Sequence, residues 1–178
     1  ATRRSRDRPG AMTTESRGAV VRNIVDGPGG KFIHNASPAT GKPLPPVPVA
    51  SPAQVRDAVN RARGAQKAWS ALGWAERKRR LLRFRDALND NLERIANIIV
   101  LENGKSPLEA ELHEVVILMI HVHHLAMRAK KVLGGHAVHL HMFWPLKRSR
   151  VEYDPRGVVG VIAPWNFPVN MVFAPLAQ

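Results

Sequence analysis

Three observations predict that the chain folds as an α/β protein. Residues 157–162 form a continuous apolar run with two glycines, which suits a strand buried on both faces of a parallel sheet. Upstream, three stretches at 51–69, 75–103 and 106–133 carry apolar residues at helical spacing. Between the last helix and the strand, residues 136–156 alternate between polar and apolar side chains, like an exposed ribbon of two strands.

Length and composition limit the possible functions. The chain has 178 residues, which fits one domain or a piece of one, and 27 Lys+Arg against 14 Asp+Glu give a formal charge of +13. It has no cysteine, which excludes disulfides, thiolate metal sites and a cysteine nucleophile within these residues. No apolar stretch approaches the roughly 20 residues that span a membrane, and the N-terminus lacks the apolar region of a secretory signal. A cytoplasmic protein is therefore expected.

Residues 1–30 are expected to form a disordered basic arm, separate from a folded part at 31–178. Residues 1–10 are basic and contain proline and glycine, and a Gly-Pro-Gly-Gly run follows at 27–30. Met12 could be the true start of the protein. A nucleic-acid-binding arm is the alternative, but the four arginines of residues 1–10, without interleaved aromatic residues, are a weak signal for one.

The first elements after the arm are short strands and a helix. Residues 31–49 read as strands around a turn at 37–42. Ser51 can cap the helix that follows, Pro52 suits its first position, and Gln54 completes a capping box.

Two longer helices follow. The helix at 75–103 ends at Gly104, where a C-terminal cap belongs, and its basic run at 77–80 is expected to face solvent. The next helix starts with a second capping box at 106–109, and its apolar run at 116–120 favours cover on more than one side. Lys105 lies between the two helices, near the negative end of the first helix dipole, which is a sufficient reason for a lysine there.

Histidines gather in the second half of the chain and raise the question of a metal site. His121 and His124 could share one helix face, and His139 and His141 one face of a strand. A zinc or nickel site is conceivable from these pairs. However, no HExxH spacing occurs and no cysteine can join, so no metal site is predicted.

The loop after the apolar run is the candidate binding region. Pro164 and Pro168 end the strand because neither can donate a ladder hydrogen bond. Trp165 and Asn166 lie between them in a tight turn. In an open α/β sheet, the loop at the carboxyl end of a strand is where ligands bind.

The stretch GVVGVIAPWNFP at 157–168 resembles the aldehyde dehydrogenase superfamily, whose members carry Gly-Val-Val-Gly-x-Ile-x-Pro-Trp-Asn-x-Pro. The LENGK segment at 101–105 is similar to a recurrent family segment, and no catalytic role is expected for it. The helix pair at 51–103 also looks like that of the family. The resemblance covers about residues 31–178 and implies the N-terminal part of the fold, with the first strand of its Rossmann-like nucleotide domain. By the same resemblance, the ribbon at 136–156 would pair with a neighbouring subunit of a homo-oligomer.

The resemblance implies roles for five consecutive residues. Ile162, Ala163, Pro164 and Trp165 would line the nicotinamide end of NAD or NADP. Asn166 would donate its side-chain amide to the oxyanion that forms when a cysteine thiolate attacks the aldehyde. A carboxamide suits this role because it donates a hydrogen bond without adding a titrating group. The implied reaction is the NAD(P)-dependent oxidation of an aldehyde to a carboxylic acid.

Other family segments are not found in these 178 residues, among them the catalytic cysteine, the Glu-Leu-Gly-Gly base segment and the segment that holds the cofactor ribose. The chain is therefore expected to be an N-terminal fragment that is inactive alone. Two other classes stay open. One is a non-catalytic module that assembles with a full-length homologue through its ribbon. The other is a basic nucleic-acid-binding protein, although its cations are spread over several helices.

Overall fold

The computed structural model describes residues 24–27, 30–138 and 148–178. The chain divides into two compact units, and the boundary along the sequence falls between Ser51 and Pro52. The expectation that residues 1–23 form a disordered arm falls outside the described residues. The proposed pair of His139 and His141 also lies outside the described residues, as does most of the first strand of the ribbon expected at 136–156.

The first unit is a small antiparallel sheet in the order β1-β2-β3. Its strands are β1 (Ile24–Gly27), β2 (Gly30–Ile33) and β3 (Val47–Pro48). Ile24 pairs with Ile33, and Ile33 pairs in turn with Val47. The short strands expected in 31–49 are confirmed, whereas the boundary of the disordered arm at residue 30 is wrong. Residues 24–27 form a strand because their backbone groups find a ladder partner in β2.

The expected turn at 37–42 is formed as well. The Ser37 amide donates to the Lys42 carbonyl at 2.9 Å, and the Gly41 amide donates to the Ser37 carbonyl at 2.8 Å. Gly41 has φ 68°, a left-handed conformation that glycine adopts without strain.

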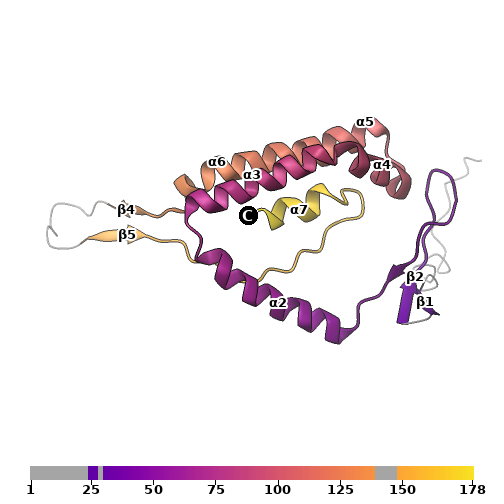
Figure 1. Cartoon of the computed structure of the whole chain (residues 1–178), viewed down its shortest axis with the longest axis horizontal. Coiled ribbons are helices and arrows are strands. Elements are labelled where there is room, and N and C mark those ends of the chain that lie inside the picture. The colour runs from indigo at the N-terminus through magenta and orange to yellow at the C-terminus, as the bar shows by residue number, and fades with distance from the viewer. Residues whose placement is uncertain (1–23, 28–29, 139–147) are drawn as a thin grey trace, which may run out of the picture. The chain divides into compact units, whose positions relative to one another are not determined.

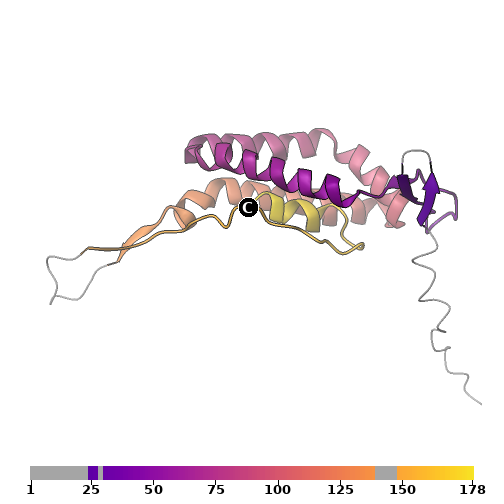
Figure 2. The ribbon, with the colours of Figure 1, turned by 90° about the horizontal axis from the view of Figure 1, so that it is seen from below.

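The second unit is mainly helical. Its helices are α2 (Pro52–Ser70), α3 (Trp74–Asp90), α4 (Leu92–Asn103), α5 (Pro107–Glu109), the π-helix η1 (Ala110–Val116), α6 (Ile117–Leu133) and α7 (Asn170–Leu176). α5, η1 and α6 follow one another without a gap, and α3 runs beside α6 in Figures 1 and 2. None of the helices among the described residues is long and apolar enough to cross a membrane.

The helix predicted at 75–103 is two helices, α3 and α4, which meet at Asn91. Asn91 has φ −112° and ψ 12°, outside the helical region. Its side-chain amide donates to the Ala87 carbonyl at 2.9 Å. Asparagine side chains compete with the helix for backbone partners in this way, and apolar spacing alone does not reveal the break. The predicted end at Gly104 is confirmed, with φ 77° at that glycine.

The start of the third helix is confirmed in detail. The Ser106 hydroxyl accepts from the Glu109 amide at 3.3 Å, and the Glu109 carboxylate accepts from the Ser106 amide at 3.4 Å. These two bonds make the capping box that the sequence predicts.

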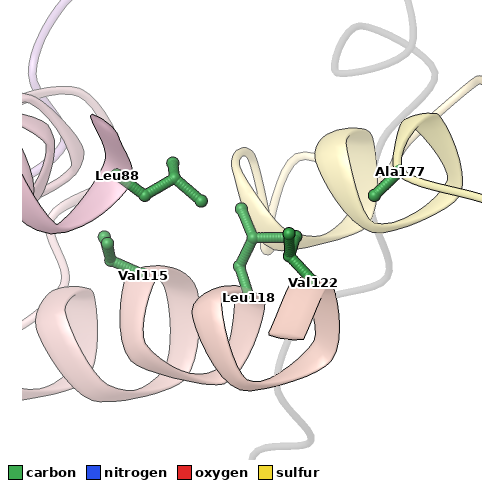
Figure 3. Packing of buried hydrophobic residues seen from close by; sticks show 5 residues of the cluster. All are labelled: Leu88, Val115, Leu118, Val122 and Ala177. Atoms are coloured by element: carbon green, nitrogen blue, oxygen red, sulfur yellow. The ribbon is translucent and has the colours of Figure 1, made fainter. Parts of the chain in front are cut away.

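The core lies where α3, η1, α6 and α7 meet. Figure 3 shows the buried side chains of this cluster pointing toward one another from these elements: Leu88, Val115, Leu118, Val122 and Ala177. A smaller cluster joins α4 to the start of η1.

Other apolar faces have no cover among the described residues. α2 buries no residue, although its apolar stripe is present. α6 is covered by both α3 and α7, as predicted, but Ile117 and Ile120 on its remaining face are exposed.

The ribbon predicted at 136–156 is formed in its described part. Strands β4 (His136–Val138) and β5 (Ser149–Val151) are antiparallel, and His136 pairs with Val151. Figures 1 and 2 show the pair leading away from the helices.

Residues 157–162 do not form the buried strand that the sequence predicts. These residues pair with no strand of the described chain, and Ile162 is 100% exposed. The prediction of a buried, paired strand is therefore wrong for this structure. A strand needs at least one neighbouring strand to bond with, and the described residues supply none for this segment.

Candidate functional site

The candidate site is the turn that joins the extended segment to α7. All five residues singled out from the sequence lie in this one stretch. Trp165 is 81% exposed and Asn166 is exposed beside it. The turn is closed by backbone bonds from the Phe167 amide to the Pro164 carbonyl and from the Met171 amide to the Phe167 carbonyl. The side chains that could meet a ligand therefore stand on a short turn with solvent on their outer side.

The LENGK segment holds the first half of this turn. The side-chain amide of Asn103 donates to the Trp165 carbonyl at 2.9 Å. The Lys105 ammonium lies 4.2 Å from the centroid of the Phe167 ring, a cation–π contact. The sequence alone predicts for Lys105 only a place near the negative end of a helix dipole, and it does not reveal this contact with the turn.

Glu114 of η1 holds the second half of the turn. It is fully buried, and its Oε1 pairs with the Lys105 ammonium. Its Oε2 accepts from the amides of Val169 at 3.1 Å and Asn170 at 2.9 Å. These two amides open α7, so the carboxylate also lies at the positive end of that helix. A buried carboxylate is tolerated only when its charge is matched and its oxygens are bonded, and Glu114 meets both conditions.

Asn170 adds a further tie between α7 and η1. Its side-chain amide donates to the His113 carbonyl at 3.2 Å. The π-helix is therefore bonded to the beginning of α7 through both a side chain and a carbonyl. Single π-helical turns inside α-helices are rare and often occur at functional sites.

The sequence carried one unused signal for this arrangement. Ala110, Glu114, Leu118 and Val122 follow one another at a spacing of four, and all four are fully buried. A carboxylate at a core position of an apolar stripe must have a partner. The sequence does not say which partner, because Glu114 and the amides that it binds are 55 and 56 positions apart.

The other candidate sites receive less support. In the part of the chain that the structure describes, no three metal-ligating side chains gather as a metal site requires. His123 Nδ1 lies 2.9 Å from a guanidinium nitrogen of Arg85 and so has a partner of its own.

The basic run at 77–80 faces solvent in part, since Arg79 and Arg80 are exposed and Arg77 and Lys78 are half-buried. The Arg77 guanidinium stacks 5.0 Å from the Trp74 ring and donates to the Ser70 carbonyl at 2.7 Å. Arg79 and Arg80 both pair with Glu76. Arg77, Arg79 and Arg80 thus each have a partner within the chain, although Arg79 and Arg80 stay exposed.

A cavity of about 510 Å³ lies away from the turn. It is lined by residues near the end of α2, the start of α3 and the second half of α6, among them Trp69, Trp74, Arg77 and Met127. None of the residues at 163–169 lines it. The cavity is therefore separate from the site that the sequence indicates.

Comparison with known proteins matches residues 24–178 to the aldehyde dehydrogenase family. The chain is 36% identical over 145 residues to a 4,4'-diapolycopene aldehyde oxidase from Methylomonas, and the match covers 81% of this chain and 27% of the relative. An NADP-dependent glyceraldehyde-3-phosphate dehydrogenase from Bacillus halodurans is similar in structure, with a TM-score of 0.71, 32% identity, and 84% of this chain and 33% of that chain covered. An NAD-dependent benzaldehyde dehydrogenase from Corynebacterium glutamicum has a TM-score of 0.73 at 29% identity, with 86% and 33% covered. The chain thus spans a quarter to a third of the length of these proteins.

Proposed function

The chain belongs to the aldehyde dehydrogenase family, and from this premise we propose that it is the N-terminal part of an enzyme that oxidises an aldehyde to a carboxylic acid. The observation that carries the proposal is the stretch at 162–166, where the family residues stand together and all but the half-buried Ala163 are exposed in the described chain. NAD or NADP would be the hydride acceptor, since similar proteins are named for each.

Asn166 would stabilise the charge that develops during the reaction. When a thiolate adds to the aldehyde carbonyl, the new carbon–sulfur bond leaves a negative charge on the carbonyl oxygen. A preorganised N–H donor favours this oxyanion, and removal of one such donor typically costs about 10²–10³ in rate. The Asn166 side chain is exposed and neutral, and both properties suit a group that must meet a substrate oxygen.

Residues 162–165 would face the cofactor. Ile162 and Trp165 offer exposed apolar surface that a planar nicotinamide ring could cover, so the residues present fit this part of the cofactor. When bound, NAD(P)⁺ supplies the acceptor for the hydride that leaves the former aldehyde carbon. The contribution of these residues would be to bind and orient the ring and to exclude water from it.

The 178 residues contain no thiol, and thiolate addition needs one. We therefore expect the chain by itself to form no NAD(P)H above blank from assorted aldehydes. Turnover by the purified chain would contradict this expectation.

The test of the proposed function uses the complete reading frame that contains these residues. The coding sequence is read past the codon for Gln178, and the whole product is assayed with NAD⁺, NADP⁺ and a panel of aldehydes. A downstream cysteine segment, NAD(P)H formation, and a loss of about 10²–10³ in kcat for Asn166→Ala would support the proposal. An active product whose kcat does not respond to Asn166→Ala would refute the role of this residue.

The ribbon supports a second, compatible proposal. Val138 of β4 and Val151 of β5 are exposed, and an exposed strand edge invites pairing with another chain. We infer that the ribbon joins subunits of a homo-oligomer, or joins this chain to a full-length homologue. Light scattering after size-exclusion chromatography would show a smaller species for Val151→Lys than for the unaltered protein. An unchanged mass would refute this inference.

The remaining predictions from the sequence have their own tests. Cell fractionation tests the cytoplasmic location. DNA binding that weakens steeply with added salt would favour the nucleic-acid alternative.

A further inference from the structure

We propose that Asn103, Lys105 and Glu114 are positioning residues for Asn166. The proposal rests on the role of Asn166 as oxyanion donor, and it adds the residues that fix where this donor stands. None of the three needs to touch the substrate.

The turn is held at fixed points on both sides of Asn166. On the N-terminal side, Asn103 donates to the carbonyl of Trp165, the residue directly before Asn166. On the C-terminal side, the Lys105 ammonium lies against the ring of Phe167, the residue directly after it. Asn166 itself is exposed, so the position of its backbone depends on its two neighbours.

Glu114 links these contacts into one unit. One of its carboxylate oxygens binds the Lys105 ammonium, and the other accepts hydrogen bonds from the first amides of α7. Since Glu114 is fully buried and Lys105 is only 14% exposed, this pair is screened little by solvent. A shift of α7 relative to η1 would break charge-assisted bonds in a buried setting, which keeps the turn in one place.

Such a fixed turn is what oxyanion stabilisation requires. The donor must already stand where the charge will develop, and a misplacement of about 1 Å can cost about 10²-fold in rate. An exposed turn without these contacts would sample several conformations. Mobile donors contribute less because they must be ordered during the reaction.

The catalytic test compares variants of the complete enzyme. We expect Glu114→Gln to lower kcat by about tenfold to 10²-fold, with a smaller change in KM. Asn103→Ala removes only the contact at Trp165 and is expected to lower kcat in the same direction by less. Glu111→Gln changes a carboxylate of the same π-helix that has no bond to the turn, and it should leave kcat unchanged.

A double-mutant cycle separates positioning from general damage. If Glu114 acts through Asn166, adding Glu114→Gln to Asn166→Ala should lower kcat by no more than about twofold further. Multiplying effects in the double variant would overturn the inference while leaving the role of Asn166 intact. If Asn166→Ala alone has no effect, the proposed function fails instead.

Hydrogen exchange in the 178-residue chain gives a second readout that needs no catalysis. Glu114→Gln should speed exchange of the Val169 and Asn170 amides by about tenfold or more, while the α3 amides keep their rates. Equal exchange at Val169 and Asn170 in both proteins would overturn the inference. If Glu114→Gln does not fold, Asn103→Ala decides the question through its own cycle with Asn166→Ala.

Discussion

The buried pair of Lys105 and Glu114 can be tested directly through the variant Lys105→Met. Methionine keeps an apolar stem of similar length in a site that is only 14% exposed, so the change removes mainly the charge. The Glu114 carboxylate stays fully buried and keeps its two backbone donors, Val169 and Asn170. The variant therefore measures the cost of a buried carboxylate without its cation.

The magnitude follows from the burial of the pair. Removing one partner of a buried pair costs about 3–5 kcal/mol of unfolding free energy. The remaining amides and the positive end of α7 still favour the charge of Glu114, so the lower end, about 3 kcal/mol, is expected. In urea, with a slope of about 2–3 kcal/mol per molar, the unfolding midpoint falls by about 1–1.5 M.

The assay is urea unfolding followed by circular dichroism, with two further variants. Asp57→Asn breaks the pair with Arg61, whose side chains are 65% and 68% exposed, and should cost less than about 1 kcal/mol. The double variant Lys105→Met with Glu114→Gln removes both charges and should be more stable than Lys105→Met alone. If Lys105→Met and Asp57→Asn shift the midpoint equally, the reasoning about the buried pair is refuted.

Three further predictions concern the core, the pH response and the exposed apolar faces. Leu118→Ala, at a fully buried position, should lower the unfolding free energy by about 3–5 kcal/mol, whereas Ile120→Ala, at an exposed position, should lower it by about 0.5 kcal/mol. Equal losses for the two variants in urea unfolding would contradict the core assignment. Hydrogen bonds from Arg80 and Arg79 lower the pKa of Glu76, so the contribution of this carboxylate is present above the ordinary glutamate pKa and is lost as pH falls through its lowered value. Arg80→Gln should raise the Glu76 pKa toward its ordinary value in a carbon-13 NMR titration, and an unchanged pKa would assign the shift to another cause. The uncovered apolar faces of α2 and α6 should make the 178-residue chain associate on heating, and a chain that stays monomeric in light scattering throughout its melt would refute this.

Local features of the fold were readable from the sequence. The capping box at Ser106 and the end of α4 at Gly104 each depend on residues within one helical turn. Strands β2 and β3 of the first sheet and the ribbon strands were found from alternation and turn residues, whereas β1 was missed because residues 1–30 were expected to be disordered. The break at Asn91 was missed because it depends on a side-chain bond to Ala87 rather than on apolar spacing.

The sequence motif located the candidate site, but it did not predict the residues that hold the site in place. The motif placed Asn166 and its four predecessors in one stretch, and the structure keeps them together there. Burial of residues 157–162 was predicted wrongly. A continuous apolar run indicates that a segment can form a strand, but it does not show that a neighbouring strand is present to pair with it.

The sequence by itself determined most of the helical segments, the caps at Ser106 and Gly104, the turn at 163–168 and the family, because each depends on neighbouring residues or on one contiguous motif. Only the tertiary structure decided what holds the turn. Asn103 and Trp165 are 62 positions apart, and Glu114 and Asn170 are 56 positions apart. The packing of α4, η1 and α7 brings these groups within hydrogen-bond distance. A buried charge requires a partner, and the packing of the helices determines which group becomes that partner. The spacing of residues along the chain does not predict it.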